Sequence, residues 1–433
     1  MDREVSAQRA ADKSFTSTPP PLRGVLRRYV PRLILALVAG LAALKIADVA
    51  SGRFAGTRER HLLRLAPGAS LRHKSNEFDY TFRTNKLGFR GPDVPFDKPA
   101  GMFRIVVLGD SFVAGYGLAE EHLLTRLLQE RIEAANRAEG AVANPPSRVE
   151  VVNVGRVGTS TIRELDLYEA LGRRFGPDLV ILAYYLGNDL AEVMQEQTDR
   201  ELAKWHPDGW PRRLTYASFP NLYMELAMLR QSRRQLREFT VRSETEIVDD
   251  LRQEARARGR DADRAVERFR SLPSQIRRDV ASGMLSEQRI IDSCIEPDRL
   301  VRALDPDDAD FDRAWARTKT HLDLLNEAVT RDGAKLVLVA IPAPFQVDRW
   351  SLEFHKQLGY EVRESWLEAP PRTALALADW AQLADVPLLD LTERLRDTEW
   401  PGYFIEDVHF TPEGSAEAAA AIGDFLLSQR LCP

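Results

Sequence analysis

Cysteine, histidine and an excess of either charge are all scarce in this sequence. Only two cysteines, Cys294 and Cys432, occur in 433 residues, and they have neither metal-ligand spacing nor the density of a disulfide scaffold. They either pair in an oxidising compartment or remain free thiols. The formal net charge of −5 gives no support for nucleic-acid binding. What remains, 44% hydrophobic and 29% charged residues, is typical of a folded protein with one large domain and an insertion, or with two domains.

Long hydrophobic runs are also scarce, and one stretch stands out. Residues 33–44, LILALVAGLAAL, carry no charge, and a mildly apolar extension past Lys45 and Asp48 reaches Ala50. A membrane-spanning helix needs ~20 mostly apolar residues, and long side chains can snorkel near its end. We therefore predict a transmembrane anchor at residues 29–50. A cleaved signal peptide and a soluble amphipathic helix are the alternatives.

Basic residues precede the apolar run and predict that this end stays in the cytoplasm. They are Arg23, Arg27, Arg28 and Arg32. Both the anchor and the signal-peptide interpretations export the rest of the chain. The predicted organisation is a disordered cytoplasmic leader at 1–28, the anchor at 29–50, a strand-poor lead-in at 51–102, and one domain at 103–433 with a charged helical insertion at about 190–312.

From Phe103 onward, apolar runs alternate with amphipathic segments. Strands are predicted at 104–109, 149–153, 179–185, 335–341 and 386–390, and helices near 120–137, 160–175, 313–331, 372–384 and 412–430. Such alternation predicts βαβ units and a parallel sheet. The fold class is therefore α/β: a doubly wound, mainly parallel five-stranded sheet with helices on both faces. Thr411 and Pro412 mark the start of the last helix.

The insertion has a different character. Residues 205–216 are aromatic and broken by proline, and residues 230–280 are dense in arginine and glutamate with helical spacing. Such charge runs indicate a solvated helical face; the alternative is a lid or a subdomain that recruits substrate. Three aromatic residues either stack on sugar rings or pack locally: Trp205, Trp210 and Tyr216.

The chain is organised around residues 104–118, RIVVLGDSFVAGYGL. Ile105 to Leu108 predict a strand buried on both faces. Gly109, Asp110 and Ser111 end it abruptly, which places polar groups at the carboxyl end of a central strand, where open α/β sheets bind ligands. Alone, this tripeptide is also an ordinary turn.

Three later segments follow in a fixed order: Asn153 to Gly158 (NVGRVG), Gly187-Asn188-Asp189, and Asp407-Val-His409. With the Gly-Asp-Ser segment, they resemble the four blocks of the SGNH (GDSL-type) serine hydrolases, which carry Ser, Gly, Asn and His in that order. The resemblance covers residues 104–189 and roughly 335–430, with a long unmatched stretch between.

The resemblance implies a catalytic triad with Ser111 as nucleophile and His409 as base. A neutral imidazole can accept the serine proton near neutral pH. The orienting acid is either Asp407 or Glu406, because the family uses both Asp-x-His and Asp-x-x-His. If residues 405–409 are extended, Asp407 shares a face with His409, whereas a tight turn favours Glu406. We favour Asp407.

The resemblance also implies an oxyanion hole made by the backbone N–H of Ser111, the N–H of Gly158 and the side chain of Asn188. The alignment selects Gly158 over Gly155. The alternative role for Asn188 is an Asx-turn after a strand. Since Gly-x-Ser-x-Gly is absent around Ser111, the sequence argues against an α/β-hydrolase nucleophile elbow.

The predicted function is an exported, membrane-anchored serine esterase that acts on acyl esters, such as O-acetyl groups of a carbohydrate. Two alternatives remain: an O-acyltransferase that uses the same serine, and a non-catalytic carbohydrate-binding or assembly protein. We expect no cofactor, no metal and no nucleic-acid partner. The partners expected are an ester substrate, such as an acylated glycan, and the membrane; the sequence identifies no protein partner.

Overall fold

The computed structural model describes residues 22–54, 68–75, 77–139, 148–194, 210–219, 221–223 and 241–433. The chain divides into a smaller unit, Met1–Gly56 with His206–Glu225, and a larger unit, Thr57–Trp205 with Leu226–Pro433. The predicted leader lies outside the described residues up to residue 21, but from Leu22 the chain is already helical, so its predicted disorder is wrong for residues 22–28.

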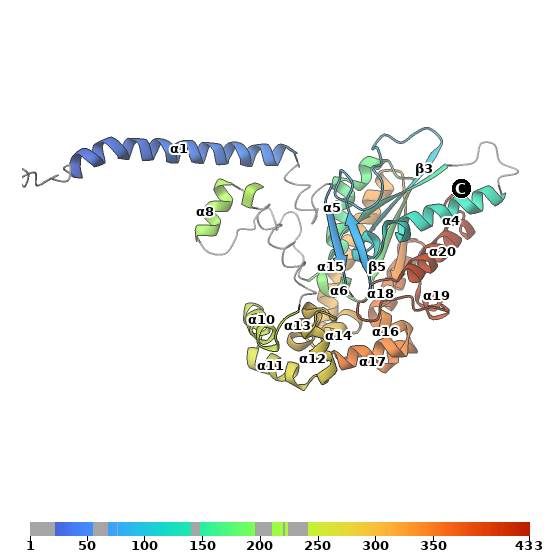
Figure 1. Ribbon diagram of the computed structural model, residues 1–433. Coiled ribbons are helices and arrows are strands. Elements are labelled where there is room, and N and C mark those ends of the chain that lie inside the picture. Colours follow the sequence, from blue (N-terminus) through green and yellow to red (C-terminus); the bar gives the residue numbers. More distant parts are fainter. Residues whose placement is uncertain are drawn as a thin grey trace, which may run out of the picture. The chain divides into compact units, whose positions relative to one another are not determined.

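A five-stranded parallel sheet forms the centre of the larger unit (Figure 1). Its strands are β3 (Met102–Gly109), β4 (Arg148–Gly155), β5 (Leu179–Tyr185), β6 (Lys335–Ile341) and β7 (Leu388–Asp390), in the order β4-β3-β5-β6-β7. Residues 105–108 are at most 2% exposed, as expected for apolar side chains covered on both faces. The predicted fold class is confirmed.

The strand order creates a switch point beside β3. The chain moves from β3 outward to β4, then crosses back to β5 on the other edge of β3. Open α/β sheets bind their ligands outside the carboxyl ends of the strands at this kind of reversal. Ser111 follows β3 and Asn188 follows β5, so both lie at the switch point.

Helices cover the two faces of the sheet (Figure 1). α4 (Leu124–Glu139) packs with α20 (Pro412–Ser428), and α5 (Thr161–Ala170) packs with α15 (Asp308–Arg331). α18 (Arg372–Leu383) completes the predicted set, and the element ends differ from prediction by a few residues. Thr411 caps α20 as predicted, because its hydroxyl accepts from the N–H of Gly414.

Short elements complete this domain. They are α3 (Ser111–Ala114), η1 (Glu120–His122), η2 (Gly172–Phe175), α6 (Asp189–Glu192), α16 (Pro344–Val347), α17 (Arg349–Gln357), η3 (Glu364–Leu367) and α19 (Thr392–Arg396). α3 begins at Ser111, two residues after the end of β3, and α6 begins at Asp189, directly after Asn188.

The lead-in contains a β-hairpin, so its prediction as strand-poor is wrong. β1 (Ser70–Lys74) pairs antiparallel with β2 (Asp79–Arg83). In β2, Tyr80 and Phe82 are buried, while Thr81 between them and the residues on either side are more exposed, a period-two pattern that the short length of the strand obscured. Arg90 is also buried, and its guanidinium donates to the carbonyl oxygens of Gly115 and Leu118, so its role is structural.

The insertion is helical and has a small hydrophobic core of its own. Its helices in the larger unit are α10 (Glu244–Ala257), α11 (Ala262–Ser271), α12 (Ser274–Ala281), α13 (Glu287–Ile295) and α14 (Arg299–Leu304). The apolar faces of α10, α11 and α13 meet, and charged residues cover their outer faces, as predicted. Cys294 is buried among these helices, and both cysteines are free thiols.

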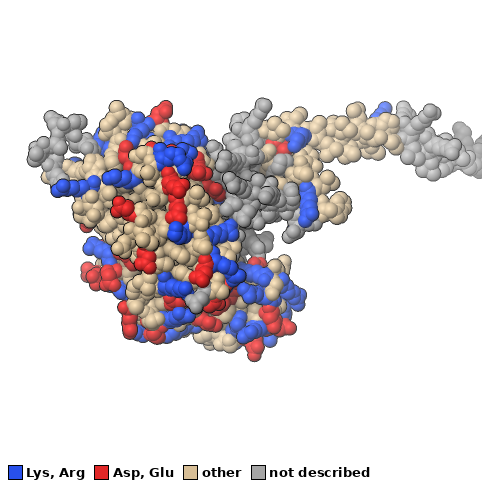
Figure 2. Space-filling model, turned by 180° about the vertical axis from the view of Figure 1, so that it is seen from behind, with Lys and Arg blue, Asp and Glu red and all other residues tan. Residues whose placement is uncertain are grey.

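The smaller unit is built on α1 (Leu22–Phe54), whose segment Val30–Ala50 is long and apolar enough to cross a membrane. This segment has 21 residues and a mean hydropathy of 2.2, and it forms a mostly uncharged surface (Figure 2). Lys45 pairs with Asp48 one turn later. The Asp48 carboxylate also accepts from the backbone N–H groups of Asn221 and Leu222. Lys45 and Asp48 are therefore paired inside the unit, and the third charge of the segment, Arg32, lies near its N-terminal end.

The same unit contains α8 (Trp210–Ser218), where an irregular, proline-broken segment was expected. Pro211 is compatible with a helix because it lies in the first turn, where its missing N–H has no intrahelical acceptor to lose. Tyr216 packs edge-to-face on Tyr223 at 5.6 Å between centroids, whereas Trp210 is exposed. Trp205 lies outside the described residues.

Candidate active site

Ser111 begins α3 immediately after β3. Asp110 caps this short helix, since its carboxylate accepts from the N–H of Phe112 at 2.9 Å. Gly115 ends the helix in the left-handed conformation, with φ of 70°. The sharp strand-to-helix change places the Ser111 hydroxyl at the carboxyl edge of the sheet, and the residue is 7% exposed.

Glycine at position 155 allows α3 to lie directly against the end of β4. A Cβ atom at Gly155 would stand 2.4 Å from the backbone nitrogen of Ala114, a distance that real structures do not tolerate. Gly155, the first glycine of the Asn153 to Gly158 segment, is therefore needed for the close packing of α3 on β4.

Ser111, His409 and Asp407 form one hydrogen-bonded line. The Nε2 atom of His409 lies 2.7 Å from the Ser111 hydroxyl oxygen, and its Nδ1 atom bonds to the Asp407 carboxylate. Ser111 and His409 are 298 positions apart in the sequence. A carboxylate on Nδ1 fixes the tautomer that leaves Nε2 free to accept the serine proton.

Asp407, and not Glu406, lies against the imidazole, but for a different reason from the one expected. Residues 405–409 bend instead of running extended. One Asp407 carboxylate oxygen accepts from the backbone N–H of His409 at 3.0 Å and also bonds to the ring Nδ1. This Asx-type turn brings the residue two positions earlier under the ring.

Two aromatic rings hold the imidazole in place. The His409 ring packs on Tyr116 and on Phe112, with centroids 4.6 Å and 5.2 Å away. Both aromatic residues belong to the 104–118 segment that carries Ser111, so this segment positions His409 as well as Ser111.

Buried carboxyl groups lie near Ser111. Burial raises the pKa of Asp110 to about 6, against the opposing effect of the Phe112 N–H and the charge of His409. Burial, together with the neighbouring carboxylates of Glu164 and Asp110, raises the pKa of Asp189 well above its usual range. Burial also disfavours ionisation of Asp407, but the charge and hydrogen bonds of His409, together with the charge of Arg289, outweigh it and the pKa of Asp407 is lowered. Of these three carboxyl groups, Asp407, which contacts His409, is the one whose pKa is lowered.

Two of the three residues expected in the oxyanion hole follow the strands that flank β3: Gly158 follows β4, and Asn188 follows β5. The N–H of Gly155 donates to its neighbour Asn153 at 2.9 Å and is therefore already used. Gly158 lies in the next loop with φ of 64°, a conformation that favours glycine. Asn188 caps no helix through its side chain; its amide nitrogen donates to Glu192 at 2.9 Å. One amide proton of Asn188 remains beyond that bond, and its role in oxyanion binding stays a prediction, as does that of Gly158.

The sequence analysis missed two charged residues that contact the loop of Asp407 from other parts of the chain. Glu77, in the hairpin turn, accepts from three successive backbone N–H groups, those of residues 405, 406 and 407. Arg289, on α13 of the insertion, donates to the carbonyl oxygen of Glu406. Neither residue lies in a segment that resembles the four blocks, and no local pattern in the sequence marks them.

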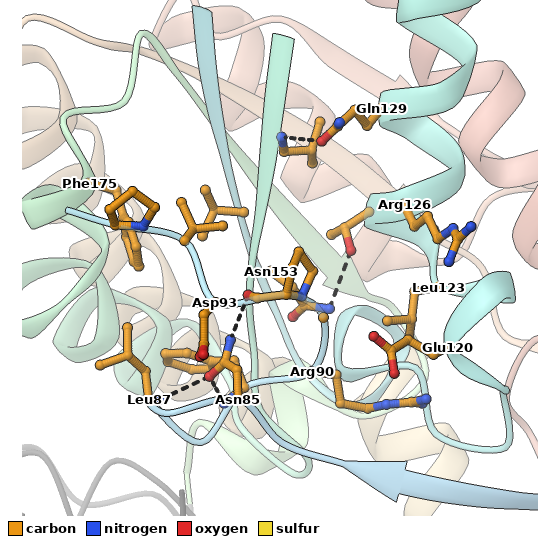
Figure 3. A pocket seen from close by; sticks show the side chains of 18 of the residues that line it. Asn85, Leu87, Arg90, Asp93, Glu120, Leu123, Arg126, Gln129, Asn153 and Phe175 are labelled. Carbon is orange, nitrogen blue, oxygen red and sulfur yellow. Dashed lines mark hydrogen bonds between the residues drawn. The ribbon is translucent and has the colours of Figure 1, made fainter. Parts of the chain in front are cut away.

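A cavity of about 710 Å³ lies elsewhere, between the lead-in, α4 and the edge strand β4 (Figure 3). Its lining includes Asn85, Arg90, Gln129, Glu133, Val151 and Phe175, and none of the three residues of the hydrogen-bonded line. Gln129 reaches from α4 and accepts the N–H of Val151 at 3.0 Å. Within the described ranges no group of three or more His, Cys, Asp or Glu residues could hold a metal.

No protein-family model and no curated protein match this chain. Several solved structures resemble it, among them TesA, with 12% identity, 75% of this chain and 97% of that chain covered, and a TM-score of 0.33. Esterase EstA from Pseudoalteromonas sp. has 10% identity, coverage of 76% and 99%, and a TM-score of 0.33. A lipase/acylhydrolase from Enterococcus faecalis has 12% identity, coverage of 76% and 97%, and a TM-score of 0.31. Scores this low carry no argument about function, which rests on the geometry above.

Proposed function

We propose that this chain is a membrane-anchored serine esterase that cleaves acyl esters through Ser111, His409 and Asp407. The observation that carries the proposal is the hydrogen-bonded line from Ser111 through His409 to Asp407 at the carboxyl end of a central strand. Nucleophile, base and orienting acid stand in the relation that acyl transfer by serine requires.

The proposed first half-reaction forms an acyl-enzyme. The Ser111 oxygen attacks the ester carbonyl carbon while Nε2 of His409 takes the hydroxyl proton. The tetrahedral intermediate collapses, the ester C–O bond breaks, and the imidazolium gives its proton to the departing alkoxide, which leaves as the alcohol. In the second half, water loses a proton to His409, attacks the acyl carbon and releases the carboxylic acid with Ser111 restored.

Stabilisation of the oxyanion is assigned to the N–H groups of Ser111 and Gly158 and to the amide of Asn188. All three residues follow strands at the switch point of the sheet. Loss of one such donor typically costs ~10²–10³ in rate. The amide of Asn188 would keep its bond to Glu192 and use its second proton for the substrate oxygen.

The proposed location is the outer side of a membrane. The support is α1, whose 21-residue apolar segment is almost entirely exposed and is preceded by basic residues. Two charged residues in an apolar segment would oppose a membrane span, but Lys45 and Asp48 neutralise each other as an ion pair. An exported esterase with this anchor suits acyl groups on an envelope or secreted carbohydrate, and O-acetyl esters are the substrate class we propose.

The test is turnover and labelling of the full-length protein in detergent. Wild-type protein should hydrolyse p-nitrophenyl acetate and react covalently with a fluorophosphonate at Ser111, and Ser111→Ala should do neither. Acetylated glycans, with and without an added sugar acceptor, then separate hydrolysis from transfer. Wild-type protein that is folded yet inert toward both probes would contradict the proposal and favour a non-catalytic role.

A further inference from the structure

The loop that carries the acid and the base needs partners from outside itself. The two ends of the loop are held together by backbone contacts. The N–H of Phe404 donates to the carbonyl oxygen of His409 at 2.9 Å, and Tyr403 and Phe410 form an antiparallel β-bridge. Between these ends the chain bends, and the N–H groups of residues 405–407 face one point. Ile405 is exposed, whereas Glu406 and Asp407 are half-buried, and backbone N–H groups that lose contact with water require acceptors.

Glu77 supplies that acceptor. One of its carboxylate oxygens lies 2.5 Å from the nitrogen of Ile405, and the other lies 2.9 Å from the nitrogens of both Glu406 and Asp407. Successive N–H groups that converge on one anion form a nest, and bonds to an ionised acceptor are about twice as strong as neutral ones. Next to Glu77, the ring of Phe78 packs on Phe404 at 5.4 Å, so the hairpin contacts the loop through apolar atoms as well.

Arg289 holds the carbonyl side of the same loop. One end of its guanidinium donates to the carbonyl oxygen of Glu406, and the other lies 2.9 Å from Nε2 of His355. Nδ1 of His355 lies 2.7 Å from the carbonyl oxygen of Ser351, which can only accept, so Nδ1 carries the proton and Nε2 accepts from Arg289. Burial and the charge of Arg289 lower the pKa of His355 to about 3, which keeps the ring neutral.

We propose that Glu77 and Arg289 are positioning residues that hold Asp407 and His409 in register with Ser111. The proposal rests on the serine esterase function above. It gives a role to two segments outside the four blocks: the hairpin supplies the anion, and the insertion supplies the cation. Displacement of reacting groups by about 1 Å can cost ~10² in rate, so a loop held at both its N–H and C=O groups is directly relevant to catalysis.

The pH dependence separates positioning from a purely structural role. Burial raises the pKa of Glu77 to about 7, and the carboxylates of Asp407 and Glu406, which face it from the loop, add to the rise; the N–H bonds oppose it. Below that pH the side chain takes up a proton and one oxygen stops accepting. The rate of the wild-type protein should therefore fall as Glu77 becomes protonated.

The decisive variant is Glu77→Gln, whose amide has one acceptor oxygen and must turn its NH₂ group toward at least one of the three N–H groups. We expect the rate of fluorophosphonate labelling of Ser111 to fall by ~10- to 10²-fold. The acid limb of that rate should move to lower pH, because the glutamine does not titrate. The matched control is Asp79→Asn in the same hairpin, which breaks only a surface pair with Arg72 and should match wild type.

Arg289→Lys tests the contact at the carbonyl groups of the loop. The lysine keeps the positive charge near Asp407, but one ammonium group cannot replace the fork that bonds both Glu406 and His355. We expect labelling to slow by ~5- to 10-fold, in line with a smaller displacement of the loop. Arg252→Lys, on the surface of the insertion beside Asp249, is the control and should leave the rate unchanged.

The outcomes are distinct. A Glu77→Gln variant with wild-type rate, or with a slow rate but an unmoved acid limb, overturns the proposal for Glu77, and a wild-type rate in Arg289→Lys overturns it for Arg289. If wild-type protein takes no label, the esterase function fails. The positioning of the loop by Glu77 is then judged by hydrogen exchange, which should be slow at the N–H groups of residues 405–407 in wild type and faster in Glu77→Gln; equal exchange in both would refute it.

Discussion

Replacement of Asp407 by asparagine isolates the charge of the orienting acid. Asparagine has the same shape and its oxygen can still accept from both the ring and the backbone N–H of His409, so the loop geometry is preserved. What is lost is the negative charge beside the imidazolium that forms when Ser111 gives up its proton. The side chains of His409 and Asp407 are only 15% and 17% exposed, so water screens this charge weakly.

The magnitude follows from the separation of the two charges. Two unit charges ~4 Å apart interact by ~4 kcal/mol at an effective dielectric constant of ~20. Part of this energy is retained by the amide dipole, and each 1.36 kcal/mol is a factor of ten in rate. Turnover of p-nitrophenyl acetate should therefore fall by ~10²- to 10³-fold in Asp407→Asn.

Glu406→Gln is the matched variant, because it removes a neighbouring charge and keeps the backbone groups that bind Glu77 and Arg289. Its turnover should fall by less than about tenfold, as for a residue outside the proton-transfer unit. Both variants should bind a non-hydrolysable ester analogue like wild type. The reverse ranking, with binding unchanged, would move the acid role to Glu406 and refute the geometry described here.

Four further outcomes are expected. Ser111→Ala should abolish covalent labelling without lowering the melting temperature. Gly155→Ala should destabilise the protein by ~1–3 kcal/mol, because its methyl group meets the backbone of α3, and thermal unfolding would show this. The pKa of Asp110 is raised to about 6 in the folded state, so between pH ~4 and ~6 the folded protein binds this proton more tightly than the unfolded chain does. Wild type should therefore lose stability relative to Asp110→Asn as the pH rises over that range. Melting temperatures of the two proteins that run parallel with pH would contradict this. A reporter fused after residue 60 should be active only on the outer side of the membrane.

The sheet was predictable because its strands are short apolar runs with few alternative structures. The predicted limits at 179–185 and 335–341 agree with β5 and β6 residue for residue. The last strand is shorter than predicted and begins at Leu388, since only three residues pair with β6 at this edge of the sheet. A run of apolar residues identifies a buried strand, but the extent of pairing depends on a neighbour far away in the sequence.

The hairpin of the lead-in was missed because its strands have five residues each and carry charges on their outer face. Alternation over so short a length is weak in a single sequence, and the turn residues around Ser75 suggest an irregular loop. Burial of Tyr80 and Phe82 becomes visible only when Phe404 and Tyr116 are brought against them.

Asp407 lies against His409, as expected, but the extended conformation on which that expectation rested is wrong. The extended conformation would have placed it on the same face as His409, but the loop bends and the residue reaches the ring through an Asx turn. Sequence spacing limits the acid to two neighbours, and the choice between them depends on backbone dihedral angles. Those angles are determined by contacts with Glu77 and Arg289, which lie 329 and 117 positions from Glu406.

The bend itself explains why an outside carboxylate is needed. The three consecutive N–H groups of residues 405–407 donate to Glu77 and not to carbonyl groups of the same short loop. Asp407 is already used by His409, since one of its oxygens accepts from both the ring and the backbone. An anion from another segment is therefore the simplest way to hold this geometry, and the turn of the β1–β2 hairpin provides it. On this argument the loop, the hairpin and α13 form one functional element, although they lie in three separate parts of the sequence.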